Sequence, residues 1–251
     1  MLMEESVQQK PAAEKEEIED WTFEGVNLEE KKVTTRETRN ILIILAVIVG
    51  IFLLTFGGAS LYNKVTGGTV IDLEGLHSKN LEGELDEKEG YLYGEFSFVK
   101  ADGLWWTEIM KNENTLLRIP LHFGPKELEE IKIEGLLSQK FNQGEDVFVA
   151  IDPNVADKYY SLAISELSFN MVKGMNRFPI GSCTTEDTIC ENRTIINCDT
   201  SQGRPTVQLA SEGNQPRVQF SGTCIKLSGQ GPDIVKAVDR LLYLWYRIMI
   251  E

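Results

Sequence analysis

Four cysteines are the side chains whose type and spacing say most about the chemistry of this chain. They lie in its C-terminal part, at Cys183, Cys190, Cys198 and Cys224. No pair forms the Cys-x-x-Cys motif that a thioredoxin-type redox pair or a zinc knuckle would need. An even number of cysteines is typical of structural disulfides in an oxidising compartment. We predict the bridges Cys183–Cys190 and Cys198–Cys224 and no metal site; the other two pairings and free thiols are the alternatives.

A glycosylation sequon lies between two of these cysteines. Asn192, Arg193 and Thr194 form the only Asn-x-Ser/Thr tripeptide in the sequence. The surrounding segment is polar, as expected for a surface loop that could carry a glycan outside the cytoplasm. We expect Asn192 to be a glycosylation site, although such tripeptides also occur by chance.

Acid–base chemistry in this chain would have to use isolated groups. Asp152 ends a short apolar run ahead of a helical pattern, where α/β enzymes often hold a carboxylate but where a capping Asp is commoner. His122 could act as a base, yet no acid or nucleophile that would complete a site is recognisable near it. The sequence contains no G-x-S-x-G, H-E-x-x-H or Walker motif. We therefore assign no catalytic residue.

A glycine-rich turn, SGQGP at 228–232, precedes the last helical pattern. Such a turn at a helix N-terminus can bind a phosphate or a carboxylate. The dinucleotide fingerprint would need a third glycine where Ile234 stands, and a P-loop would need Gly-Lys followed by Ser or Thr. We interpret the segment as a connecting turn and predict no cofactor.

Four aromatic residues are candidates for contact with a partner. Trp21 and Phe23 lie beside an acidic run, which suits a short docking motif but is equally typical of an ordinary disordered tail. Trp105 and Trp106 are neighbours in a predicted strand and must point to opposite faces of it. One of them is therefore expected in the core and the other at a surface that could bind a partner.

The elements that must position these groups begin with an apolar run at 41–56, inside a segment from 40 to 63 that has no charged residue. About 20 apolar residues can cross a bilayer as a helix, so residues 40–62 are predicted to form a transmembrane helix. Four Lys and Arg residues between 31 and 39 place the N-terminus in the cytoplasm and the remainder outside. A cleaved signal peptide is the alternative.

Strand and helix periodicities organise the rest of the chain. Aromatic residues alternate with others from Tyr91 to Phe98, which is the period of a strand. Helical spacing recurs at 160–171 and again after Pro232, a residue that suits the first helical position. The predicted parts are a disordered acidic cytoplasmic tail at 1–39, the transmembrane helix at 40–62, a stalk at 63–90, a β-rich subdomain at 91–146 and a disulfide-bridged α/β subdomain at 147–251.

The predicted fold class is therefore α+β, or mixed α/β. It consists of an antiparallel β meander followed by a sheet with two packed helices, carried outside the membrane on a single N-terminal transmembrane helix. The formal net charge of −14 argues against a nucleic-acid partner, because a phosphate-binding surface needs clustered Lys and Arg.

Three segments of the chain resemble those of an uncharacterised group of single-pass surface proteins from small archaea. These segments are GEFSFVKADGLW at 94–105, CENRT at 190–194 and DIVKAVDRLL at 233–242. The resemblance implies an extracytoplasmic globular domain on a membrane anchor and brings no activity with it.

Together these patterns favour a membrane-anchored binding or structural module of the cell envelope, without catalysis. Its expected location is the cell membrane, and its expected partners are the lipid bilayer and an envelope or membrane protein. Two alternatives stay open, namely a non-catalytic subunit of a membrane complex and an envelope enzyme with an unrecognised carboxylate site such as Asp152.

Overall fold

The structure is a computed structural model that describes residues 42–52, 71–112 and 114–250. The chain divides into two compact units, Met1–Thr69 and Val70–Glu251. Each unit is described by itself. The predicted cytoplasmic tail, with Trp21 and Phe23, lies outside the described residues.

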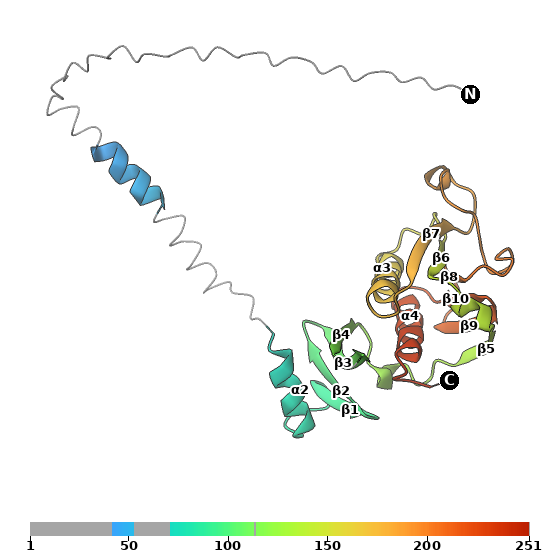
Figure 1. The fold of residues 1–251 in the computed structure, drawn as a ribbon, viewed down its shortest axis with the longest axis horizontal. Helices are drawn as coiled ribbons and strands as arrows, with labels where there is room; N and C mark the ends of the chain where they lie inside the picture. Colours follow the sequence, from blue (N-terminus) through green and yellow to red (C-terminus); the bar gives the residue numbers. More distant parts are fainter. Residues whose placement is uncertain (1–41, 53–70, 113, 251) are drawn as a thin grey trace, which may run out of the picture. The chain divides into compact units, whose positions relative to one another are not determined.

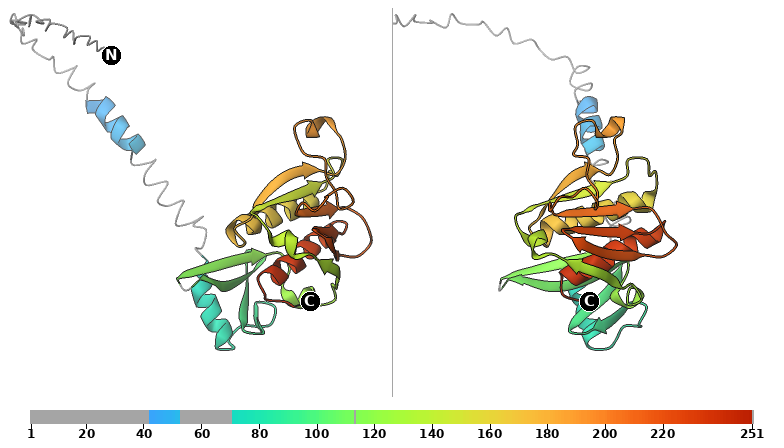
Figure 2. Two further views of the ribbon diagram at one scale, coloured as in Figure 1. Left: turned by 45° about the vertical axis from the view of Figure 1, so that its right-hand side comes forward. Right: turned by 90° about the vertical axis from the view of Figure 1, so that its right-hand side faces the viewer.

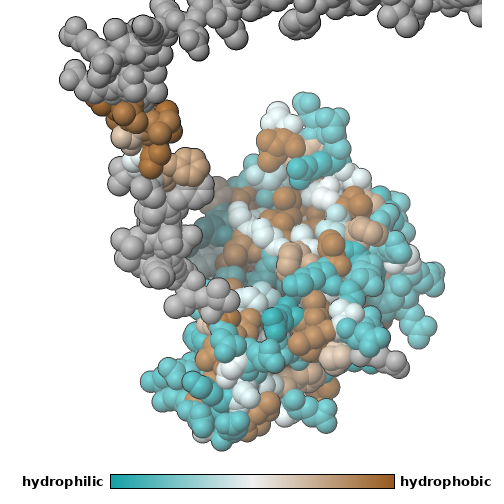
Figure 3. All heavy atoms as spheres, turned by 60° about the vertical axis from the view of Figure 1, so that its left-hand side comes forward, coloured by the Kyte–Doolittle hydropathy of each residue, from teal (hydrophilic) through white to brown (hydrophobic). Residues whose placement is uncertain are grey.

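In the first unit, residues 42–52 form a helix, drawn in blue in Figures 1 and 2. Its side chains are hydrophobic, as the brown spheres of Figure 3 show, and most are exposed. No helix among the described residues is both long enough and apolar enough to span a bilayer.

The predicted fold class, which includes a transmembrane helix over 40–62, is therefore wrong. The finding that overturns it is that no helix among the described residues could span a bilayer; residues 40, 41 and 53–62 of the predicted span lie outside the described ranges. The described part of the chain is mixed α/β with two sheets.

The second unit contains the two sheets and three α-helices. Its α-helices and strands are α2 (Leu73–Leu81), β1 (Gly90–Tyr93), β2 (Phe96–Ala101), β3 (Leu104–Asn112), β4 (Thr115–Leu121), β5 (Ile133–Leu137), β6 (Asp146–Ile151), α3 (Lys158–Lys173), β7 (Phe178–Cys183), β8 (Thr206–Ala210), β9 (Arg217–Gly222), β10 (Cys224–Ser228) and α4 (Pro232–Trp245). Short 3-10 helices occur at Pro125–Glu127 (η1), Gln139–Asn142 (η2) and Thr188–Cys190 (η3).

The first sheet is an antiparallel meander in the order β1-β2-β3-β4. Asp102 and Gly103 connect β2 to β3, with φ angles of 52° and 78°. A two-residue hairpin turn with positive φ at both positions matches the twist of the flanking strands, and an Asp-Gly pair tolerates these angles. The turn sets the register in which Val99 pairs with Trp106.

The second sheet has six strands in the order β5-β9-β10-β8-β6-β7. Strands β10, β8, β6 and β7 run parallel to one another, β9 is antiparallel to β10, and β5 is parallel to β9. Parallel neighbours need a crossover connection, and α3 supplies it between β6 and β7. Helices α3 and α4 lie on the same face of this sheet (Figures 1 and 2).

The residues at the start of each long helix explain why the helix begins there. The Asp157 carboxylate accepts hydrogen bonds from the backbone N–H groups of Tyr159 and Tyr160, at 2.6 and 3.1 Å, and so caps α3. Helix α4 begins after Gly231, whose φ of 56° suits glycine, and has Pro232 in its first turn.

Helix α4 is the centre of the core. Nine of its residues are buried, so it is enclosed on most sides rather than on one stripe. It contacts β10 and β9 on one side. On the other, Tyr243 packs edge-on against Phe98 of β2 with 5.7 Å between ring centroids. One hydrophobic cluster therefore includes residues from the meander, both helices and the second sheet.

The segment 63–90, for which the sequence predicts a stalk, contains α2. Asn80 of this helix is buried, and its Nδ2 donates hydrogen bonds to the carbonyl oxygens of Tyr91 and Phe98, at 3.1 and 3.2 Å. These long-range bonds attach α2 to the first two strands. No local pattern in the Gly- and charge-rich sequence predicts them. The predicted subdomains 91–146 and 147–251 lie within one compact unit.

Two disulfides attach the long segment between β7 and β8 to the second sheet. They are Cys183–Cys190 and Cys198–Cys224, the pairs predicted from the sequence, and the described residues hold no free cysteine. Cys183 ends β7 and Cys224 begins β10. The bridges therefore fix a loop that carries little regular structure.

The two bridges should differ in their effect on stability, because they close loops with sequence separations of 7 and 26 residues. By loop entropy, Cys183→Ala with Cys190→Ala should lower the free energy of unfolding by about 2.4 kcal/mol, and Cys198→Ala with Cys224→Ala by about 3.5 kcal/mol. Urea unfolding of both double variants without reductant measures this. A larger loss from the shorter loop would contradict the prediction.

Candidate functional site

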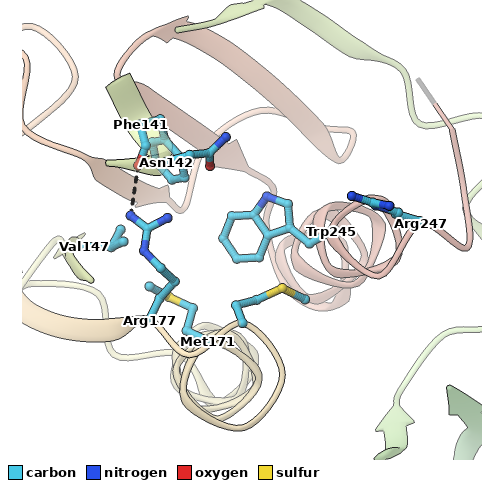
Figure 4. Close-up of a pocket in the computed structure, with 8 residues that line it drawn as sticks. Phe141, Asn142, Val147, Met171, Arg177, Trp245 and Arg247 are labelled. Atoms are coloured by element: carbon cyan, nitrogen blue, oxygen red, sulfur yellow. Dashed lines mark hydrogen bonds between the residues drawn. The ribbon is translucent and has the colours of Figure 1, made fainter. Parts of the chain in front are cut away.

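A cavity of about 300 Å³ lies where α3 and α4 both end (Figure 4). Its wall comes from four separate segments: η2, the start of β6, the end of α3 with the chain that follows it, and the end of α4. The lining residues are Phe141, Asn142, Val147, Met171, Met175, Arg177, Trp245 and Arg247. Aromatic rings, thioethers and guanidinium groups dominate this set, which contains no carboxylate.

The cavity's apolar wall is built around Trp245, the last residue of α4. Its indole ring lies across the middle of the cavity in Figure 4, and its centroid is 6.3 Å from that of Phe141. Met171 is buried, and Met175 is partly buried, on the α3 side. Thioether side chains adapt their shape and contact aromatic rings favourably, so these residues form an apolar surface that can accommodate a flat molecule.

The ends of the two helices are held together by Tyr246, which caps α4. Its hydroxyl donates a hydrogen bond of 2.7 Å to the Asn170 side-chain oxygen on α3. A Cβ atom at Gly174 would collide with the Tyr246 ring, so glycine allows this close approach. Trp245 and Met171 therefore stand on elements whose relative position is fixed.

Arg177 provides one of the cavity's two cationic groups. Its Nε and Nη2 donate to the carbonyl oxygens of Glu145 and Phe141, at 3.3 and 2.9 Å. Its guanidinium carbon lies 5.4 Å from the Phe141 ring centroid. Burial lowers the pKa of Arg177, but a guanidinium keeps its charge at neutral pH.

Arg247 provides the other cationic group. It is exposed and lies two residues beyond the end of α4, with φ at 59°. Its backbone N–H donates to the Leu244 carbonyl at 2.9 Å, which closes the turn that ends the helix. A cation near a helix C-terminus is favourable, because the last carbonyls carry partial negative charge.

A second group of titratable side chains lies elsewhere, at the junction of β4, α3 and α4. His122 follows β4, and its Nδ1 lies 3.0 Å from Oε2 of Glu166 on α3. Asp239 of α4 accepts a hydrogen bond of 2.9 Å from the backbone N–H of Phe123. Tyr243, one turn further along α4, donates to the Phe123 carbonyl at 2.8 Å. The residues after β4 are thus attached to both helices.

Asp239 is a buried carboxyl group whose protonated form is favoured. It is 0 % exposed, and its Oδ1 meets no hydrogen-bond donor among the described residues. Burial, and then the charge of Glu166, raise the pKa of Asp239 well above its usual range. The hydrogen bond with Glu166 raises the pKa of His122.

Two tryptophans named as candidate contacts lie in the meander. Trp105 is buried, and its Nε1 donates to Oε1 of Glu127 at 2.9 Å. Trp106 is partly exposed on the opposite face, and its Nε1 donates to the Ala101 carbonyl at 3.1 Å. Neither ring lines the cavity, and of the two only Trp106 presents a surface to solvent.

Asp152, the carboxylate of the alternative enzyme hypothesis, makes a local cap. Its Oδ1 accepts a hydrogen bond of 2.9 Å from the backbone N–H of Asn154. Asn192 is exposed in the disulfide-bridged loop. Neither residue lies in the cavity.

Sequence reasoning missed both groups of residues. The sequence shows no acid partner near His122, because Glu166 lies 44 positions further along the chain. One signal for a buried acid was visible in the sequence: Glu166 lies between Ala163 and Leu167, on the apolar side of a helical pattern. The cavity residues gave no such signal, since Trp245 and Met171 fit ordinary core positions.

No protein-family model, curated protein or solved structure matches the chain, so the resemblance to archaeal surface proteins stays a prediction.

The raised pKa of Asp239 predicts a pH dependence of stability. Because the pKa of Asp239 is raised on folding, the unfolded chain loses this proton first as pH rises, and stability falls from about pH 4 upward. The raised pKa of His122 acts in the same direction, since its contribution is lost as pH rises through the folded-state value. The substitution Asp239→Asn removes the titrating carboxyl group but keeps a side-chain oxygen that can accept the hydrogen bond from the Phe123 N–H.

We expect Asp239→Asn to become more stable relative to the wild type as pH rises, by at least about 1 kcal/mol between pH 5 and pH 8. Urea unfolding at both pH values measures the difference. The exposed Asp199→Asn is the matched control and should show no such change. A wild-type-to-variant difference that is equal at the two pH values would contradict the raised pKa of Asp239.

Proposed function

We propose that this protein is a binding module, and that the cavity at the ends of α3 and α4 holds a small ligand with a flat apolar group. The observation that carries the proposal is the Trp245 ring, which lies across a cavity instead of being covered by other side chains (Figure 4). A partly exposed indole beside Phe141 offers a surface on which another ring can stack.

The size and composition of the cavity support this proposal. Its volume of about 300 Å³ is at the lower end of the range for small-molecule sites. Such sites are mainly apolar, with a few polar groups that fix the orientation of the ligand. Here Trp245 and Met175 supply the accessible apolar surface, the buried Phe141 and Met171 pack behind it, and Asn142, Arg177 and Arg247 supply the polar groups.

The position of the cavity also favours binding. Because Tyr246 and Gly174 fix the helix ends against each other, little ordering is needed when a ligand arrives. The titratable cluster of His122, Glu166 and Asp239 does not line the cavity. Binding is therefore better supported than acid–base catalysis at this site.

We propose further that the module works in an oxidising compartment outside the cytoplasm. The two disulfides support this location, because thiols of cytosolic proteins are generally kept reduced. The exposure of Asn192 is compatible with a glycan on the same loop. Contact with the bilayer and with an envelope protein stays a prediction from the sequence.

Replacing the indole tests the proposed function. The full chain should bind the naphthyl probes 2-naphthoate or 2-naphthamide, measured by isothermal titration calorimetry. Trp245→Leu keeps an apolar side chain but removes the stacking surface, so Kd should rise about tenfold. Trp106→Leu, outside the cavity, is the control and should leave Kd unchanged. Binding of neither probe, or equal binding by Trp245→Leu, would contradict the proposal.

A further inference from the structure

We propose that the ligand of this cavity is an organic acid: a flat apolar ring that stacks on Trp245 and carries a carboxylate, which Arg177 binds. This inference rests on the proposed function and adds the chemical class of the ligand. It follows from the distribution of charge around the cavity and from the hydrogen bonds of Arg177.

The cavity is positively charged within a strongly acidic chain. The formal net charge is −14, yet the eight residues that line the cavity include two arginines and no Asp or Glu. Most of the surface therefore repels anions, whereas this cavity attracts them. Neither Arg177 nor Arg247 forms an ion pair with a described carboxylate.

Neutralising the helix ends does not account for both arginines. The C-termini of α3 and α4 each carry about half a negative charge, and two guanidinium groups exceed that sum by about one charge. The carbonyl oxygens of Glu145 and Phe141 add dipoles but no full charge. A ligand with one negative charge would balance what remains.

Arg177 is already oriented for an anion. Two of its three nitrogens, Nε and Nη2, are held by backbone carbonyls. The third, Nη1, has no hydrogen-bond partner among the described residues and points into the cavity towards the Trp245 side (Figure 4). A planar guanidinium that is fixed in this way can donate to a carboxylate without losing side-chain freedom.

Arg247 lies on the other side of the Trp245 ring from Arg177 (Figure 4). It is exposed and makes no side-chain hydrogen bond with the described residues, so it contributes chiefly a long-range attraction to anions. The Asn142 side chain borders the same cavity and offers an amide donor. A ring on Trp245 would thus lie between two cationic groups, of which Arg177 is the one positioned for direct contact.

A series of probes that share one ring and differ in charge tests the inference on the full chain. The probes are 2-naphthoate, 2-naphthamide and 2-naphthylmethylammonium, titrated calorimetrically at low and at moderate salt. We expect the anion to bind at least about tenfold more tightly than the amide, and the cation to bind most weakly. The preference for the anion should shrink as salt screens the charges.

Two arginine variants locate the effect. Arg177→Gln should abolish the preference for naphthoate over naphthamide. The Arg177→Gln variant also loses two hydrogen bonds to the backbone, so Arg247→Gln is tested beside it. Arg247→Gln removes an exposed charge without losing a side-chain bond and should reduce the preference about threefold. Arg217→Gln on β9 removes the same charge outside the cavity and should leave the preference intact.

The outcomes separate the two proposals. Equal or tighter binding of naphthamide by the wild type would overturn the organic-acid inference while the proposed function stands. A preference for naphthoate that survives undiminished in Arg177→Gln would overturn it as well, whatever Arg247→Gln does. Failure of all three probes to bind would overturn the proposed function itself.

Discussion

The burial of α4 on most of its surface is the constraint on which the rest of this structure depends. A helix enclosed in this way must find partners for every polar group that it carries into the core. Asp239 accepts the Phe123 N–H on Oδ2, and burial raises its pKa, which favours the uncharged form. Arg240 donates to the carbonyl oxygens of Ile131 and Ile250. These bonds hold the chain after β4, the chain before β5 and the residues that follow α4.

The cavity follows from where this helix ends. Trp245 is the last residue of α4, and Tyr246 directly after it is bonded to Asn170 of α3. The chain then turns at Arg247, so the indole lies at the boundary between core and solvent. Tyr243, two residues earlier and on another side of the same helix, is fully covered. The same packing that stabilises the fold thus leaves one ring partly uncovered beside two cations.

Short-range chemistry was readable from the sequence. The start of α4 depends on Pro232, whose ring restricts the backbone locally, and the two disulfide pairs depend on a residue type that bonds to its own kind. The transmembrane helix predicted over 40–62 was wrong: it rested on apolar composition alone, and no helix in the described part of the chain could span a bilayer.

Long-range chemistry could not be read in the same way. His122 and Glu166 meet only because β4 and α3 pack together, and the cavity needs four segments between Phe141 and Arg247. Each of these residues has an ordinary role in its own segment, and only the packing of the helices brings them together. The candidate site is therefore a property of the tertiary structure.

A crystal structure of the full chain with bound 2-naphthoate would test the central claim most directly. Our account predicts the naphthyl ring against Trp245 and a carboxylate oxygen within hydrogen-bonding distance of Nη1 of Arg177. A cavity that is empty at saturating probe, or a carboxylate that points to solvent away from both arginines, would contradict it.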